Sequence, residues 1–233
     1  MVAVAQLVRA PDCVSGGCGF NPRQPPLRHL RNAWWCVPIL LCAAGATRAA
    51  GQAPRPRSQI GIGIGRSIPT GAFRSDTTGE GFAGGWVLTG HVTLRAPLRL
   101  ERLRLRIDAT YARNGANDQL NADLTSAFGQ SSDEHIMLLG ADANAVYPLT
   151  PASRFGLFPF GGIGVWHSFV RVNVGEASTH TSATKLGWQL GGEITRGPVF
   201  LELRYVRIAA AKGYPAVSFF PVSVGVRFGK GMP

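Results

Sequence analysis

Two adjacent residues, His167 and Ser168, form the pair in this sequence that most suggests catalysis. A serine activated by a histidine can attack an ester or amide carbonyl. Neighbouring residues on a β-strand point to opposite faces, so the pair cannot form such a dyad if its segment is a strand. His91 and His135 have no serine at a spacing that gives a common face, and His180 lies in a polar segment where solvation is the simplest interpretation. We therefore expect no catalytic residues, and acyl transfer or deacylation is kept only as an alternative.

Residues that could bind a metal or a cofactor follow no recognisable motif. The four cysteines lie in the first fifth of the chain, at Cys13, Cys18, Cys36 and Cys42. Their spacing does not give the two close pairs of a zinc site. The glycine-rich run at residues 61–65 is not followed by a helical pattern, which excludes a nucleotide-binding loop. We expect neither a metal nor a cofactor.

Composition favours an all-β protein without a nucleic-acid partner. The chain has 233 residues, of which 30 are glycine and only 16% are charged, and this suits a turn-rich fold. Its formal net charge is +11, but the basic residues are dispersed. Lysine occurs only at Lys185, Lys212 and Lys230, so no lysine-rich patch is present. Nucleic-acid binding is not expected.

The elements are clearest in residues 98–111, where apolar and charged residues alternate from Arg102 onward. Leu103, Leu105 and Ile107 alternate with Arg104 and Arg106. A period of two predicts a β-strand with one apolar and one charged face. The same period marks other segments, at residues 59–68, 84–95, 134–147, 154–169, 184–195, 199–208 and 217–228. The faces of residues 155–169 cannot be assigned, because glycines leave either face plausible.

The connections between these eight predicted strands alternate between long and short. The long ones are expected at residues 69–83, 113–133 and 170–183. Long loops at one end and tight turns at the other are typical of an antiparallel up-and-down transmembrane β-barrel. We predict one such barrel over residues 58–230.

The composition of the charged face indicates whether the apolar side of the barrel points outward. Arginine outnumbers lysine there, and its planar group suits buried ion pairs. An eight-stranded barrel is just wide enough for side chains to fill, so we expect an ion-pair network in the lumen, and a narrow pore of weak anion preference is the alternative. The expected network comprises Arg95, Arg102, Arg104, Arg106, Asp108, Asp142, Glu193, Glu202, Arg204 and Arg227. Aromatic residues expected at the membrane interfaces are Trp86, Tyr111, Tyr147, Phe155 and Phe228. The opposite orientation would give a soluble, secreted or periplasmic ligand-binding barrel.

Residues 28–50 have the three parts of a secretory signal peptide: a basic start, an apolar run and small residues at the end. Residues 51–57 would be a short linker. Residues 1–27 resemble a translated transfer-RNA gene, as at AQLVRAPDC and GFNP. We expect that segment to be disordered and the true start to lie close to Leu27.

Four short stretches carry a recognisable pattern: residues 158–166 (FPFGGIGVW), 186–193 (LGWQLGGE), 201–205 (LELRY) and 225–228 (GVRF). Together they resemble the outer-membrane β-barrel family of the outer-membrane protein A type. The resemblance implies a monomeric barrel in the outer membrane of a Gram-negative-type bacterium, in contact with lipopolysaccharide and inserted by the barrel-assembly machinery. The family usually ends on the terminal aromatic residue, whereas residues 229–233 follow Phe228 here.

For function, the resemblance implies a structural, adhesive or minor-pore role. The loops 69–83, 113–133 and 170–183 would then form the surface for a ligand. We expect no peptidoglycan-binding domain. A lipid A-modifying enzyme is the remaining alternative for a barrel of this kind.

Overall fold

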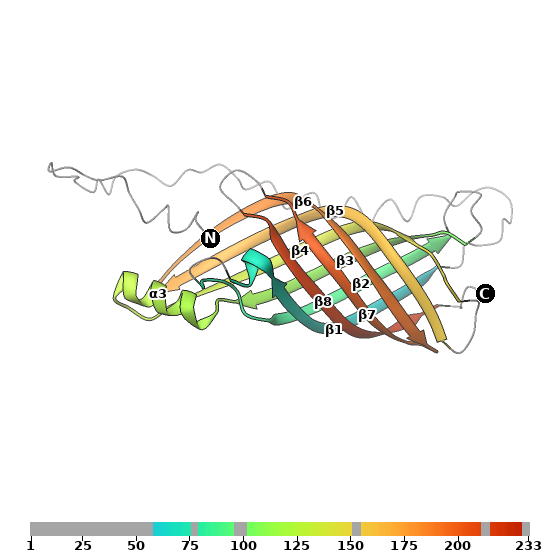
Figure 1. Ribbon diagram of the computed structural model, residues 1–233, viewed down its shortest axis with the longest axis horizontal. Helices are drawn as coiled ribbons and strands as arrows, with labels where there is room; N and C mark the ends of the chain where they lie inside the picture. The colour runs from blue at the N-terminus through green and yellow to red at the C-terminus, as the bar shows by residue number, and fades with distance from the viewer. Residues whose placement is uncertain (1–57, 76–78, 96–101, 151–154, 211–214, 230–233) are drawn as a thin grey trace. The chain divides into compact units, whose positions relative to one another are not determined.

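The described part of the chain is a closed barrel of eight antiparallel strands (Figure 1). The computed structural model describes residues 58–75, 79–95, 102–150, 155–210 and 215–229. Its strands are β1 (Gln59–Thr70), β2 (Gly85–Arg95), β3 (Arg104–Gly115), β4 (Ser132–Val146), β5 (Phe155–Val174), β6 (Ala177–Arg196), β7 (Val199–Ile208) and β8 (Val217–Phe228). Each strand pairs with the next, and β8 pairs with β1. The predicted fold class is confirmed. The expectations for residues 1–57 lie outside the described residues.

All three predicted loops contain regular structure. Residues 170–183 belong mostly to β5 and β6, which meet at a turn where Gly175 has a φ of 55°. Glycine, serine and threonine suggested a loop, yet alternating valines and threonines favour a strand once a partner is adjacent. The loop predicted at residues 113–133 contains α3 (Asp118–Phe128), capped by the Asn117 side chain, which accepts from the Leu120 N–H. A short 3-10 helix, η2 (Gly71–Phe73), follows β1.

The strand that opens the charged pattern is shorter at its start than expected. β3 begins at Arg104, and Arg102 lies in a turn before it. Residues 98–101 lie outside the described part. At the other end, β3 continues to Gly115, three residues into the predicted loop.

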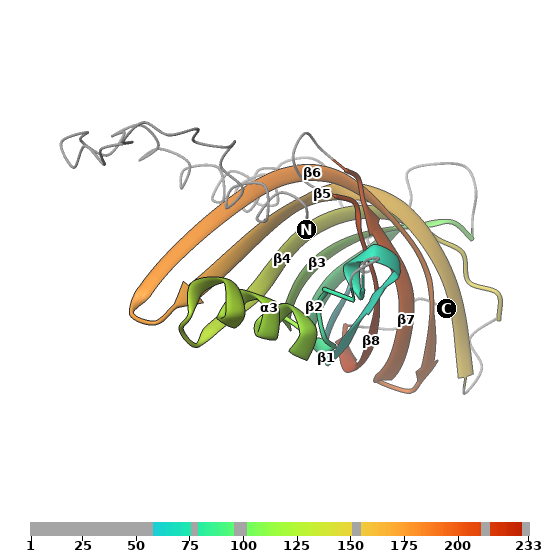
Figure 2. The same ribbon diagram turned by 60° about the vertical axis from the view of Figure 1, so that its left-hand side comes forward.

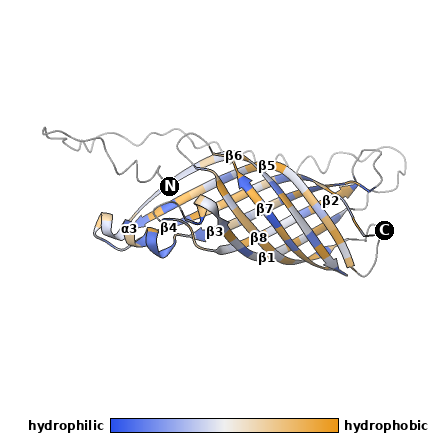
Figure 3. Ribbon diagram, viewed as in Figure 1, coloured by the Kyte–Doolittle hydropathy of each residue, from blue (hydrophilic) through white to orange (hydrophobic). Residues whose placement is uncertain are grey.

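The outward face of the barrel is apolar, and polar side chains point inward. Apolar and polar residues alternate along each strand (Figure 3). Ile163 on β5 is 72% exposed and Leu186 on β6 is 70% exposed, whereas Glu193 and Glu202 are fully buried. A soluble binding barrel would have the opposite arrangement. This is the arrangement of a transmembrane barrel.

The height of the apolar belt fits a bilayer. On β5, outward apolar residues extend from Phe155 to Val165. The ten steps between these two residues, at about 3.4 Å each, cover roughly 34 Å of strand, or about 26 Å along the barrel axis at a tilt of about 40°. Outer-membrane barrels have an apolar band about 25 Å tall. Within the described residues, no helix is both long and apolar enough to span a membrane.

Candidate functional site

The charged layer of the lumen is centred on Arg106 of β3. We define this layer as Arg106, Asp108, Glu193, Glu202, Arg204 and Arg227, all directed inward. The Arg106 guanidinium donates to Asp108 Oδ1 at 2.8 Å, to Glu193 Oε2 at 2.9 Å and to Glu202 Oε2. One arginine thus joins three carboxylates from β3, β6 and β7. Its flat face also lies 4.4 Å from the Phe160 ring centroid.

Two further arginines complete the charge balance of this layer. Arg204 Nη2 lies 2.7 Å from Glu202 Oε1, and Arg227 pairs with Glu193 Oε1. Three guanidinium groups therefore face three carboxylates, and all of these residues except the partly exposed Arg227 are buried. Such a balance is what buried charges require.

Neutral polar side chains extend the charged layer to β4. Gln189 accepts from Arg204 Nη1 at 3.1 Å and donates to Asn144 Oδ1 at 3.0 Å. Asn144 donates in turn to Asp108. Gln189 Nε2 also lies 3.4 Å from Asp108 Oδ2, so Asp108 accepts from Arg106, Asn144 and Gln189.

The ten residues expected in the lumen are not all brought together. Seven form or border the charged layer. Arg95 and Arg102 are exposed, because the first ends β2 at the barrel mouth and the second precedes β3. Arg104 is buried but makes none of the ion pairs described above. Asp142, expected to pair with the β3 arginines, instead accepts from the Trp166 indole N–H at 3.0 Å.

An apolar layer occupies the half of the lumen at the end where β1 connects to β2 and β5 to β6, which we call the outer half. The alternation alone predicts polar residues there. Its members are Phe73, Phe82, Val87, Ala112, Ile136, Leu138, Trp166, Val206, Ile208, Val217 and Phe219. Phe73 and Phe82 come from the connection between β1 and β2, and their rings lie 5.1 Å apart. Phe73 reaches Phe219 of β8 at 6.4 Å, and Phe219 meets Trp166 edge-on at 5.7 Å. The connection thus packs its two rings against the apolar layer.

Two glycines make room for Trp166 at the junction of the layers. A Cβ at Gly140 of β4 would come within 2.6 Å of the indole ring, and one at Gly187 of β6 within 2.7 Å. The ring therefore covers both backbones, and its N–H reaches Asp142 below. Trp166 is fully buried and joins the apolar layer to the polar one.

His91, Glu193 and Glu202 place possible ligand atoms within 4.8 Å of one another, which makes them a candidate metal site. Neither ring nitrogen of His91 has a hydrogen-bond partner among the described residues. All four carboxylate oxygens, however, already contact Arg106, Arg204 or Arg227. A divalent cation would lie among three guanidinium groups whose charge the acids already balance. These residues do not fit a metal, and we assign none.

The residues considered for catalysis are separated as the alternation requires. His167 points outward, and its Nδ1 lies 2.9 Å from Thr184 Oγ1. Ser168 points inward and donates to the Ala183 carbonyl at 3.2 Å. The two side chains therefore lie on opposite faces of β5.

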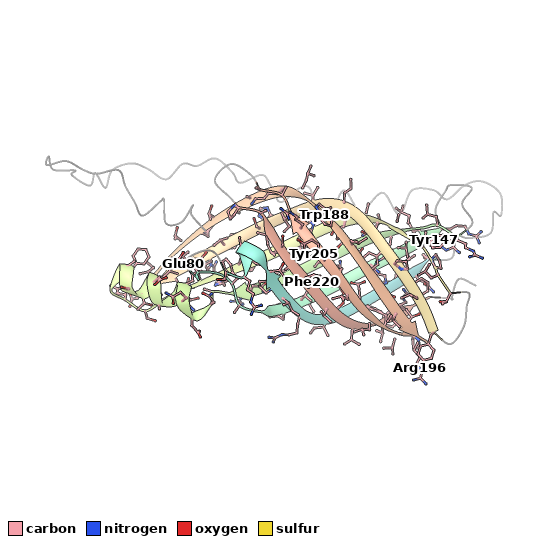
Figure 4. All side chains as sticks on the ribbon, viewed as in Figure 1. Glu80, Tyr147, Trp188, Arg196, Tyr205 and Phe220 are labelled. Carbon is pink, nitrogen blue, oxygen red and sulfur yellow. The ribbon has the colours of Figure 1, made fainter. Side chains whose placement is uncertain are left out.

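The five expected interface aromatics lie at both ends of the belt. Trp86 contacts Tyr111 at 5.0 Å near the outer end, and Tyr147, Phe155 and Phe228 are exposed at the other end. Sequence reasoning missed a second outer group, Trp188, Tyr205 and Phe220, with ring centroids 5.4 and 5.1 Å apart (Figure 4). The sequence signal was available, because each of these three shares the outward parity of its strand.

The outer extension is the second candidate site. β5 and β6 each have 20 residues, whereas β7 has 10, and they run on beyond β7 and β8, with β4 paired beside β5 as far as Val174 (Figure 2). Pairing of β6 with β7 begins only at Gly187, so residues 177–185 pair with β5 alone among the described residues. Leu120 and Leu124 of α3 cover one face of this extension at Val172.

Comparisons with known proteins bear on the fold alone. No family model and no curated protein matches the chain. Ail, the attachment invasion locus protein of Yersinia pestis, is 14% identical with a TM-score of 0.48, and the match covers 74% of this chain and 99% of Ail. Neisserial surface protein A is 19% identical with a TM-score of 0.45, over 73% of this chain and 95% of that one. The N-terminal barrel of Pseudomonas aeruginosa OprF is 10% identical with a TM-score of 0.43, over 75% and 100%. By its closed antiparallel topology, the chain is a small eight-stranded barrel of the kind that the sequence resembles.

Proposed function

We propose that this chain is an outer-membrane barrel with a closed lumen and an adhesive role, in which the outer extension binds a partner outside the cell. The apolar belt supports the membrane location, and the two filled layers favour a closed lumen over a minor pore. Export by the signal peptide at residues 28–50, insertion by the barrel-assembly machinery, a monomeric state and the absence of catalysis belong to the same proposal. The observation that carries the adhesive role is the β6 edge at residues 177–185, which pairs with no strand other than β5 in the described part of the chain.

The edge at residues 177–185 has the properties of a strand that accepts another strand. Natural sheets protect such edges with proline, bulges or charged side chains. This edge reads ASTHTSATK, with no proline and a single lysine at its inner end. An extended peptide could add to it through main-chain hydrogen bonds, which give affinity with little demand on sequence.

The hydrogen bonds around Leu186 show which β6 residues face the open side. The Leu186 carbonyl accepts from Ala209 N–H at 2.9 Å, so Leu186 faces β7. In an antiparallel pair, alternate residues direct both backbone groups to the same neighbour. Ser182 therefore directs its N–H and C=O to the open side, whereas Ala183 faces β5.

This alternation provides a test at one position. Ser182→Pro removes an open-side N–H and no bond to β5, because proline is tolerated on an edge strand whose N–H faces outward. Ser182→Ala removes the hydroxyl and keeps the N–H. Peptides selected from a phage-displayed library on the wild-type barrel in nanodiscs should bind the alanine variant and lose binding to the proline variant. Equal binding to both variants would contradict strand addition at this edge.

Membrane location is tested separately. The protein should fractionate with outer membranes and change its mobility between unheated and boiled gel samples, as folded barrels do. A soluble periplasmic protein without a heat-dependent shift would favour the ligand-binding alternative and would remove the basis of the adhesive proposal.

A further inference from the structure

A row of basic side chains crosses the outward face of the extension. His135 of β4 lies opposite Arg171 of β5, which lies opposite His180 of β6. One row closer to the belt, Arg113 of β3 lies opposite Met137. All four share the outward parity of the apolar belt, and all except His135, which is buried, are exposed. We call Arg113, His135, Arg171 and His180 the basic row.

The charge of the basic row is only partly compensated. On the outward face of residues 132–137, 170–174 and 177–186, the one acidic side chain is Asp133. Its two oxygens accept from Asn173 Nδ2 at 3.1 and 3.2 Å, and Oδ2 lies 3.7 Å from His135 Nδ1. Arg113 and Arg171 are exposed on either side. The face therefore carries a surplus of positive charge.

An aromatic residue orders the outer part of the row. The Phe169 ring stacks on His180 at 5.1 Å with an interplanar angle of 21°, and the Arg171 guanidinium lies 5.8 Å from the same ring. A side chain held on an aromatic face loses less entropy when it binds a ligand. The row is thus partly organised in advance.

Arg113 lies at the height of the headgroup layer of a membrane, and the other three residues of the basic row lie just beyond that layer. Leu139 is the last strongly exposed apolar residue of β4, and the polar pair His167 and Thr184 lies beside it. Arg113 is two residues beyond this level and His135 is four. At about 3.4 Å per residue and a tilt of about 40°, these are roughly 5 and 10 Å above the apolar belt. The headgroup region occupies about 5–8 Å on each side of a bilayer.

We propose that the basic row binds the phosphate groups of an anionic glycolipid of the outer leaflet, such as lipid A. The inference rests on the proposed membrane location. Guanidinium groups pair with phosphate oxygens through two parallel hydrogen bonds. Acyl chains of the same molecule would lie on Leu139, Val165 and Leu186 just below, a continuity that a soluble anion does not require.

A matched pair of double variants tests the site. Arg113→Gln with Arg171→Gln removes two charges from the row. Arg66→Gln with Arg207→Gln removes two exposed, outward charges from β1 and β7, beside Trp86 and Trp188. Binding of fluorescent lipid A to the folded protein in neutral detergent should weaken at least about tenfold in the first variant, because each lost bidentate pair counts for roughly a factor of ten. It should change less than about twofold in the second.

Several outcomes would overturn the proposal. Equal weakening in both double variants would mean attraction to overall charge rather than a site. Equal binding of dephosphorylated lipid A would show that the site does not recognise phosphate. Full competition by inorganic phosphate at matched concentration would show that the site binds a soluble anion rather than the lipid. The heat-dependent gel shift of the same samples separates the two proposals. A retained shift without lipid binding defeats this inference alone, whereas an absent shift defeats the membrane location.

Discussion

The two layers of the lumen fill the same barrel by different means. The charged layer depends on pairing, because each of its acids is held by at least one arginine and Arg106 serves three. The apolar layer depends on shape, because Trp166 fits over two glycines and rings from four segments meet. Loss of one charged partner should therefore affect several groups at once. Loss of one apolar group should leave a local cavity.

The largest effect is expected at the centre of the charged layer. Arg106→Ala would leave Asp108, Glu193 and Glu202 without their common partner in a buried space. Breaking a buried pair costs about 3–5 kcal/mol, because a carboxylate is left uncompensated. Urea unfolding in phospholipid vesicles measures the change. The exposed Arg95→Ala is the control and should stay within about 0.5 kcal/mol of wild type; similar losses in both variants would mean that the network adds no stability.

A cavity made in the apolar layer should lower the free energy of unfolding. Leu138 and Leu139 are neighbours on β4, but Leu138 is fully buried and Leu139 is 56% exposed on the outward face. Leu138→Ala should cost about 2–5 kcal/mol, since both the transfer and the cavity terms apply. In Leu139→Ala, lipid can fill the space, so the loss should be smaller by about 1 kcal/mol or more in the same unfolding assay. A larger loss at Leu139 would reverse the assigned faces.

Removing the Trp166–Asp142 hydrogen bond, which joins the two layers, should lower the free energy of unfolding by an intermediate amount. Trp166→Phe keeps an aromatic ring and removes the N–H that donates to Asp142. A hydrogen bond to a charged acceptor contributes about 1.5–3 kcal/mol, and a buried acceptor left alone is costly. Combining this change with Asp142→Leu should recover part of the lost stability. Losses that simply add in the double variant would show that the two side chains act independently.

Closure of the lumen needs both layers, and it predicts a channel measurement. The wild-type protein in planar bilayers should show no discrete current steps, because Phe73 and Phe82 seal an already filled barrel. Phe73→Ser with Phe82→Ser should admit water to the outer half while the charged layer still blocks it. Steady current through the wild-type protein would contradict the closed lumen, and its ion preference would test the weak anion selectivity expected of a pore.

The comparison also explains how far the sequence could be interpreted. Alternation predicted the strands and the inward side of Arg106 and Glu202, because charged residues label a face clearly. It could not label residues 155–169, since Trp166 points into an apolar part of the lumen and Ile163 points outward. Both faces are apolar there. Partners across the lumen, such as Arg106 with Glu193, were also beyond a strand-by-strand pattern, because they depend on barrel closure.

The smallest effect should come from adding a single methyl group to the apolar layer. Gly140→Ala places a Cβ within 2.6 Å of the Trp166 ring, which must shift as a whole because Gly187 lies on its other side. Overpacking of this kind costs about 1–3 kcal/mol, and we expect the lower end because alanine favours a strand more than glycine does. Gly192→Ala is the matched control, since nothing lies within 4 Å of its Cβ position. It should leave the free energy of unfolding unchanged or slightly raised. If Gly140→Ala were equally neutral, the apolar layer would be loosely packed around Trp166. Its difference from the charged layer would then rest on polarity rather than on shape.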